Sequence, residues 1–169
     1  TEKPVEHTNN LLSKINKIAQ EISVLITFEN GNGSGVIIAK EANNYYVLTA
    51  KHVASGDRSI KIITPDGQSH NVDKNTMKTW PGIDLALIKF TSNQTYKTAT
   101  LADYPVGLID QDQLVFVSGW PISKQTQEIS LDKNREFSAG FLLGWQSGTN
   151  QAIDNRSLSQ GYELSYTNI

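Results

Sequence analysis

His52 is a residue whose surroundings could support chemistry. It follows the apolar run 46–48 and the short residues Thr49 and Ala50, so a strand is expected to end just before it and deliver it to the start of a loop. An imidazole with a pKa near ~6.5 can take a proton from a hydroxyl at neutral pH and return it to a leaving group. Taken alone, a histidine at a strand end is more often structural, so its interpretation depends on its neighbours.

Asp84 is the acid that could orient this imidazole. It follows Pro81 and Gly82, which predict a turn, and it precedes the apolar run 85–90. A carboxylate held against an imidazole fixes its tautomer and stabilises the imidazolium formed during proton transfer. Ile83 and Leu85 are expected to shield it from water. Alone, Asp84 could equally be a turn residue whose carboxylate accepts hydrogen bonds from nearby backbone amides.

A glycine-rich segment, residues 31–35, lies upstream of the histidine. We predict a tight turn here that runs into a strand, with the glycines allowing close backbone approach beside the reactive region. The segment lacks the Gly-Lys-Ser/Thr ending of a phosphate loop and no helical pattern follows it, so a nucleotide site is disfavoured.

The elements that must position these residues are mostly strands. Apolar residues at helical spacing predict one amphipathic helix over residues 8–22, capped by Thr8 or Asn9 and packed on the sheet that follows. Short β-branched and aromatic runs then predict strands at 23–28, 35–38, 45–48, 60–63, 85–90, 114–117 and 137–143. Turn clusters separate these runs and no helical crossover intervenes, which favours an antiparallel barrel or sandwich. The polar connection 91–112 is the candidate boundary between two halves.

In their order, these segments resemble the trypsin-like serine peptidases, within the cysteine-free bacterial branch that includes HtrA and glutamyl endopeptidase types, and they look closest to cyanobacterial members. The likeness rests on the runs 33–38, 47–53 and 82–87, and on a His–Asp separation of 32 positions (84 minus 52). Residues 115–121 look like the first strand and turn of a second barrel. The resemblance implies an all-β fold of two antiparallel barrels: a tail and helix at 1–21, a first barrel at 22–100, and a linker with the first part of an incomplete second barrel at 101–169.

The same resemblance implies catalytic roles for His52, as general base and acid, and for Asp84, as its orienting carboxylate. It also exposes a gap, because the family's Gly-x-Ser-Gly-Gly-Pro nucleophile turn does not occur in the sequence. Ser147 has the wrong glycine spacing and is expected in a turn, while Ser165 is expected within a strand at 164–169. The remaining serines considered are no better placed: Ser118, Ser157 and Ser159.

The sequence therefore predicts a serine endopeptidase whose serine lies beyond Ile169, in the same polypeptide or in a separate C-terminal fragment, with the 169-residue chain inactive by itself. Two alternatives stay open. One is a catalytically silent trypsin-like module that binds or assembles with other proteins. The other is an unrelated β-barrel, in which His52 and Asp84 would lie too far apart to hydrogen-bond.

The amino-acid composition excludes several classes of binding partner. With 15 basic and 17 acidic side chains and no run of like charge, nothing suggests nucleic-acid binding, and no apolar run approaches the ~20 residues of a membrane span. There are no cysteines, and His7 and His70 have no companions at metal-ligand spacing, so no cofactor or metal is expected and both are interpreted as solvated surface histidines. The expected partners are a protein or peptide substrate, the C-terminal remainder and, as in some cyanobacterial members, a helical repeat domain. The compartment stays open, with a secreted or periplasmic location favoured over the cytoplasm.

Overall fold

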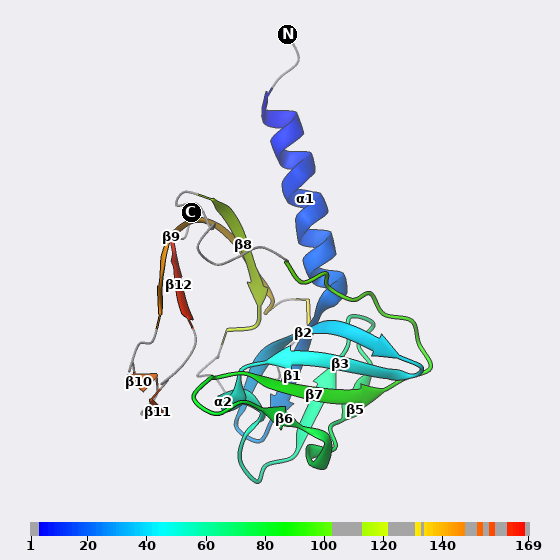
Figure 1. Ribbon diagram of the computed structural model, residues 1–169. Helices are drawn as coiled ribbons and strands as arrows, with labels where there is room; N and C mark the ends of the chain where they lie inside the picture. Colours follow the sequence, from blue (N-terminus) through cyan, green and yellow to red (C-terminus); the bar gives the residue numbers. More distant parts are fainter. Residues whose placement is uncertain are drawn as a thin grey trace.

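In the described residues, one long helix is followed by antiparallel sheets of seven and three strands and by a small two-stranded hairpin (Figure 1). The computed structural model describes residues 4–102, 113–121, 131–132, 134–147, 152–153, 156–157 and 162–167. The helix, α1, spans Pro4–Ile22 and so begins four residues before the predicted start at Thr8. Proline is well tolerated at the first helical position, because an amide there would have no intrahelical acceptor.

The first sheet has seven strands in the order β5-β4-β1-β2-β3-β7-β6, with every pair antiparallel. The strands are β1 (Ser23–Phe28), β2 (Gly31–Glu41), β3 (Asn44–Thr49), β4 (Ile60–Ile63), β5 (Ser69–Asn71), β6 (Lys78–Thr79) and β7 (Ala86–Thr91). A one-turn helix, α2 (Lys51–Ala54), follows β3, and a 3-10 turn, η1 (Lys74–Thr76), follows β5. The sheet curls until β5 contacts β7, where the rings of His70 and Phe90 lie 4.6 Å apart. This closure makes the first barrel.

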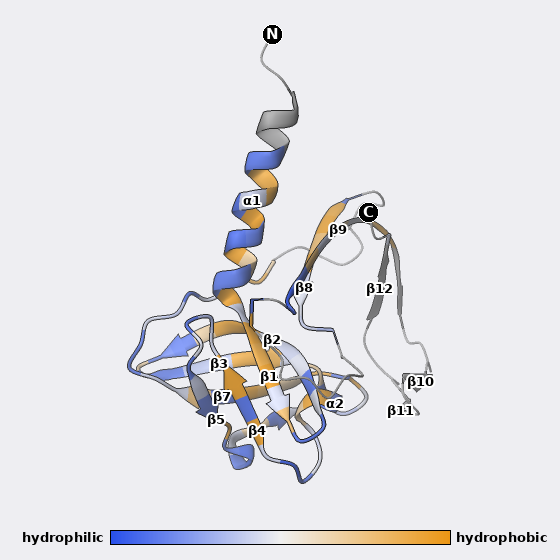
Figure 2. Cartoon of the chain, turned by 180° about the vertical axis from the view of Figure 1, so that it is seen from behind, coloured by the Kyte–Doolittle hydropathy of each residue, from blue (hydrophilic) through white to orange (hydrophobic). Residues whose placement is uncertain are grey.

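The barrel interior is apolar because alternate residues of each strand point inward. Figure 2 shows the hydrophobic colours concentrated on these strands. The buried cluster consists of Val24, Ile26, Ile37, Tyr45, Val47, Val53, Ala54, Ile60, Ile62, Ala86, Ile88 and Phe90. Val53 and Ala54 belong to α2, so this short helix is anchored by its own apolar face.

The glycine-rich segment differs from its prediction. Residues 31–35 are not a turn but the first part of strand β2, and the tight turn lies just before them, with Asn30 at φ 63°. The glycines serve close packing instead of backbone freedom. A Cβ on Gly33 would collide with the Val53 side chain, and one on Gly35 with the Val47 side chain.

The second sheet has three strands in the order β12-β9-β8. They are β8 (Leu114–Gly119), β9 (Glu136–Ser147) and β12 (Tyr162–Tyr166), with a small hairpin of β10 (Ala152–Ile153) and β11 (Arg156–Ser157). Three strands cannot close a barrel, so within the described residues this second barrel is incomplete. Ser147, predicted in a turn, is the last residue of β9 and pairs with Tyr162, whereas Ser165 lies in a strand as predicted.

Helix α1 was expected to pack on the barrel, but only its C-terminal part does so. Glu21 pairs with Lys97 at 2.7 Å, and Asn16 accepts a hydrogen bond from Arg135 at 2.6 Å. The N-terminal part of the helix projects away from the first sheet (Figure 1), and Leu11 there is 52% exposed. Ile18, between the two contacts, is itself 56% exposed. Among the described residues, no helix combines the length and apolar character that crossing a membrane requires.

His70 is not the solvated surface histidine that the sequence suggested; the side chain of His7 lies outside the described residues. His70 is half-buried against Phe90, and its Nε2 lies 3.2 Å from the hydroxyl of the fully buried Thr64. Asp66 completes this cluster by accepting hydrogen bonds from Thr64 at 2.6 Å and from the Tyr96 hydroxyl at 3.0 Å. The cluster ties the β4–β5 turn to the segment after β7.

The charge of Asp66 is expected to stabilise the first barrel. Desolvation raises the pKa of Asp66, but hydrogen bonds from Thr64, Tyr96 and the Gln68 amide outweigh it and leave the pKa below its usual value. A depressed carboxyl pKa adds stability above the unfolded value of ~4, and this stability is lost as pH falls through the folded value. Asp66→Asn should therefore lower the free energy of unfolding at pH 7 by up to about 1 kcal/mol, since Asp66 is exposed and screened.

Urea unfolding of the variant and the wild type at pH 7 and pH 3 measures this effect, with Asp57→Asn, at an exposed carboxylate in another loop, as the control. The difference between Asp66→Asn and wild type should shrink at pH 3. A difference that is the same at both pH values would contradict the role of the charge.

Candidate active site

His52 is mounted on the one-turn helix that follows β3. The amides of Val53 and Ala54 donate to the carbonyl of Ala50 at 3.1 and 3.3 Å, and the amide of Ser55 donates to that of Lys51 at 2.8 Å. The predicted loop start is therefore a helical turn. Because Val53 and Ala54 are buried in the barrel core, the orientation of His52 is fixed by the packing of its neighbours.

Asp84 lies just before β7, at the end of the sheet where β3 finishes. Pro81 and Gly82 occupy the centre of a turn in which the Ile83 amide faces the Trp80 carbonyl at 3.5 Å, and Gly82 has φ 71°, as position i+2 of a type II turn requires. β3 and β7 are antiparallel neighbours, with Thr49 paired to Ala86. The residues just after β3 and just before β7 therefore lie side by side.

The two predicted residues meet through both carboxylate oxygens. Oδ2 of Asp84 lies 2.6 Å from Nδ1 of His52, and Oδ1 accepts the backbone amide of His52 at 2.9 Å. This contact excludes the alternative of an unrelated barrel in which the two residues lie apart. The side chains of His52 and Asp84 are 26% and 22% exposed. Of the two residues expected to shield Asp84, Ile83 is half-buried and Leu85 is 40% exposed.

Burial sets the electrostatics of Asp84. Desolvation raises the pKa of the Asp84 carboxyl, while a backbone hydrogen bond at Lys51 and the positive charge of the Lys51 side chain oppose the rise. When the carboxylate is charged, it holds a proton on Nδ1 of His52 and leaves the lone pair of the ring on Nε2. Nε2 is then the atom that can accept a proton from a third group.

Two residues of the glycine-rich segment join the two sheets beside this pair. The backbone amide of Trp120, which follows β8, donates to Oγ of Ser34 at 2.7 Å, and Asn32 Nδ2 donates to the Trp120 carbonyl at 3.1 Å. Ser34 also accepts, through its carbonyl, the hydroxyl of Thr49 at 2.8 Å, three residues before His52. Asn32 is only 1% exposed. In the sequence, Asn32 and Ser34 alternate with glycines, a pattern that predicts a turn and gives no indication of a junction between two sheets.

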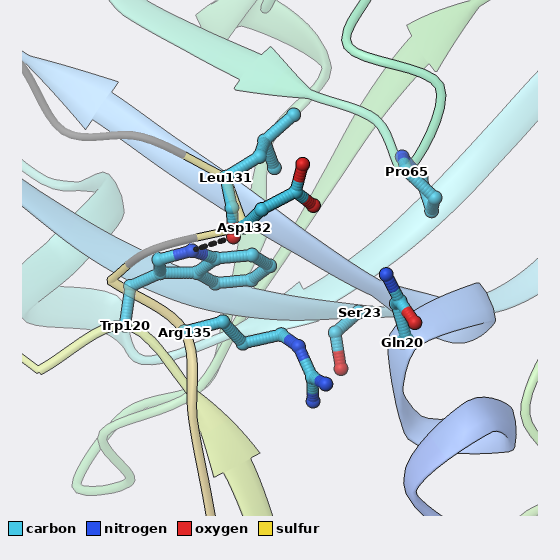
Figure 3. Close-up of a pocket in the computed structure, with 7 residues that line it drawn as sticks. All are labelled: Gln20, Ser23, Pro65, Trp120, Leu131, Asp132 and Arg135. Carbon is cyan, nitrogen blue, oxygen red and sulfur yellow. Dashed lines mark hydrogen bonds between the residues drawn. The ribbon is translucent and has the colours of Figure 1, made fainter.

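Trp120 also lines a small pocket (Figure 3). The other lining residues come from the end of α1 and the start of β1, from the β4–β5 turn, and from Leu131, Asp132 and Arg135. Trp120 Nε1 donates to the Leu131 carbonyl at 3.0 Å. Neither His52 nor Asp84 lines it. Within the part of the chain that the structure describes, no serine hydroxyl hydrogen-bonds to Nε2 of His52, and no group of three or more potential metal ligands is present.

Comparisons with known proteins agree with this geometry. A sequence model of the trypsin-like peptidase domain matches residues 33–166. The serine protease Do-like HtrA of Bacillus subtilis is 33% identical over 116 residues, which cover 69% of this chain and 23% of that protein. The protein of the same name from Lactococcus lactis subsp. cremoris is 34% identical over 74 residues, 44% of this chain and 18% of its own length. The chain thus spans less than a quarter of the curated relatives it matches.

A solved structure shows the same fold over nearly the whole chain. The crystal structure of a Mycobacterium tuberculosis protein, an inactive form with a serine-to-alanine mutation, superposes with a TM-score of 0.61. The match covers 98% of this chain and 69% of that protein's chain, at 15% sequence identity. The likeness therefore supports the same overall fold for this chain.

Proposed function

Because the chain belongs to the trypsin-like peptidase family, we propose that it supplies the acid–base half of a serine endopeptidase, with His52 as proton acceptor and donor and Asp84 as the orienting carboxylate. The nucleophilic serine, in this proposal, lies in polypeptide that follows Ile169, either continuous with the chain or as a separate fragment. The substrates are proteins or peptides.

The chemistry follows from the tautomer that Asp84 imposes. Nε2 of His52 removes the proton of the serine hydroxyl while the serine oxygen bonds to the carbonyl carbon of the substrate. The imidazolium, stabilised by Asp84, then gives this proton to the amide nitrogen as the carbon–nitrogen bond breaks and leaves an acyl-enzyme. A water molecule then attacks the acyl-enzyme, giving its proton to Nε2 of His52. The serine oxygen takes that proton back as the carboxylic acid product leaves. The observation that carries the proposal is the bidentate contact of Asp84 with the ring and the backbone amide of one histidine.

The second sheet supports a continuation of the chain. Four large apolar side chains of β8 and β9 are between 40% and 53% exposed, namely Leu114, Val117, Phe141 and Leu143. Exposed apolar strands with unpaired edges favour association with further strands. The strands that complete the second barrel would cover them, and we assign that role to the same C-terminal segment that carries the serine.

The alternative, a silent binding or assembly module, is favoured by the lack of a Gly-x-Ser-Gly-Gly-Pro run in the sequence. The full product of the coding sequence and the 169-residue chain should be compared with a serine-directed fluorophosphonate label and on casein and a peptide panel. We expect labelling and turnover only in the full product. An unlabelled, inactive full product would favour the silent module, and serine-type turnover by the 169-residue chain would contradict a nucleophile beyond Ile169.

A further inference from the structure

Arg58 binds the end of the helix that carries His52. Its Nη2 donates to the backbone carbonyl of His52 itself at 2.8 Å and to that of Val53 at 3.1 Å. The last carbonyls of a helix have no intrahelical donors. In the described residues no backbone amide donates to these two carbonyls, because the chain leaves the helix at Ser55 and turns at Gly56, where φ is 97°. The guanidinium of Arg58 takes the place of the missing amides.

The guanidinium is held from its other side by an aromatic ring. The Cζ of Arg58 lies 3.7 Å from the centroid of the Phe28 ring, a close cation–π stack. Phe28 is the last residue of β1, pairs with Ile60 in β4, and needs Gly31 opposite it, because a Cβ there would collide with the ring. The Nε of Arg58 is buried without a hydrogen-bond partner in the described part of the chain. An unsatisfied buried donor is unfavourable, so the other contacts must fix the guanidinium in place.

We propose that Arg58 is a positioning residue for His52, and that the Phe28–Arg58 stack holds α2 at the angle where both the ring and the amide of His52 meet Asp84. The proposal rests on the function proposed above for its effect on catalysis, but the geometry exists without the serine. Arginine suits the task because its planar fork can bind carbonyls while its face stacks on an aromatic ring. Its positive charge also favours a helix C-terminus.

The expected defect follows from the precision that proton transfer requires. If α2 tilts, Nδ1 of His52 moves away from Asp84 and the ring samples the tautomer with the proton on Nε2, which cannot accept the serine proton. A displacement of about 1 Å can lower a rate by ~10²-fold. Arg58→Met, which keeps the length and apolar part of the side chain, should lower kcat of the full product by roughly 10- to 100-fold while KM changes little.

The decisive experiment measures the protonation of the His52 ring directly. Imidazole ¹⁵N chemical shifts of the 169-residue chain report which ring nitrogen of His52 carries the proton. Wild type should show the Nδ1–H tautomer, and Arg58→Met should shift it toward a mixture. Arg58→Lys, which keeps the charge without the fork, should restore the wild-type shifts only in part. Lys61→Met, a charge loss at a nearby exposed position, is the matched control and should leave the shifts unchanged.

A folded Arg58→Met chain with unchanged His52 shifts would overturn the proposal. If Arg58→Met does not fold, Phe28→Leu weakens the same stack while keeping an apolar side chain, and unchanged His52 shifts in that variant would overturn it equally. The two proposals fail separately, since an inactive full-length wild type would contradict the protease function and leave the tautomer measurement untouched.

Discussion

Replacement of His52 by alanine in the full product is expected to lower kcat by about 10⁶-fold, the size of loss seen when the proton acceptor of a serine triad is removed. The reason is that no other described group can take the serine proton at this place: Nε2 of His52 is the atom left free by the 2.6 Å contact with Asp84. Substrate binding does not require this proton transfer, so KM should change far less than kcat. Steady-state kinetics on a chromogenic peptide measures both.

His70→Gln is the matched control for His52→Ala. His70 is the other histidine of the first barrel, and its Nε2 contacts the Thr64 hydroxyl. It makes no contact like that of His52 with Asp84 among the hydrogen bonds of the described residues. Its replacement should leave kcat within a few-fold of wild type below the unfolding temperature. Without the proton acceptor, only substrate binding and the oxyanion contacts are left to accelerate the reaction. A loss in kcat of less than about 10³-fold in His52→Ala would therefore contradict the assignment of His52 as the proton acceptor.

Asp84→Asn in the same full product should lower kcat by about 10⁴-fold. Asparagine can still accept the His52 backbone amide, so the local fold is expected to persist, but its side-chain N–H favours the tautomer with the proton on Nε2. The imidazolium also loses its counter-charge. Kinetics across pH 6 to 9 should show a low rate throughout, since deprotonation of the imidazole cannot correct the tautomer.

Stability separates this loss from unfolding. Desolvation raises the pKa of Asp84, which means that the folded protein holds the charged carboxylate less readily than the unfolded chain does. The stability associated with the neutral carboxyl is present below the unfolded pKa and lost as pH rises through the folded one. Asparagine is neutral at every pH, so the variant should unfold at no lower temperature than wild type at pH 7. A clear decrease in its midpoint would show that the Asp84 charge is structural.

Local patterns made the pair of reactive residues predictable. β3 ends at Thr49, three residues before His52, and the Pro81–Gly82 turn places Asp84 just before β7, so both residues could be recognised from strand ends and turn chemistry. Their contact depends on β3 and β7 being neighbours, which periodicity does not specify. The resemblance to a known family supplied that part of the prediction, and the structure places the pair together.

Other features could not be predicted because tertiary packing decides them. The glycines at 31–35 looked like turn residues, yet Gly33 and Gly35 are strand residues that make room for Val53 and Val47. Arg58 gave no sequence signal, since its role depends on a ring from β1 and carbonyls from α2. A single arginine in a polar loop is ordinarily interpreted as a solvated charge.

The acid–base pair and the junction between the sheets are built from different hydrogen bonds. His52 and Asp84 both belong to the first barrel, whereas Asn32 and Ser34 hold Trp120 of the second half. A displacement of Trp120 along β2 would therefore change the distance from Nε2 to anything carried by the second half, while the pair itself stayed intact. The first barrel therefore contains the complete proton-transfer pair, and the hydrogen bonds that join the second half to it involve neither residue of that pair.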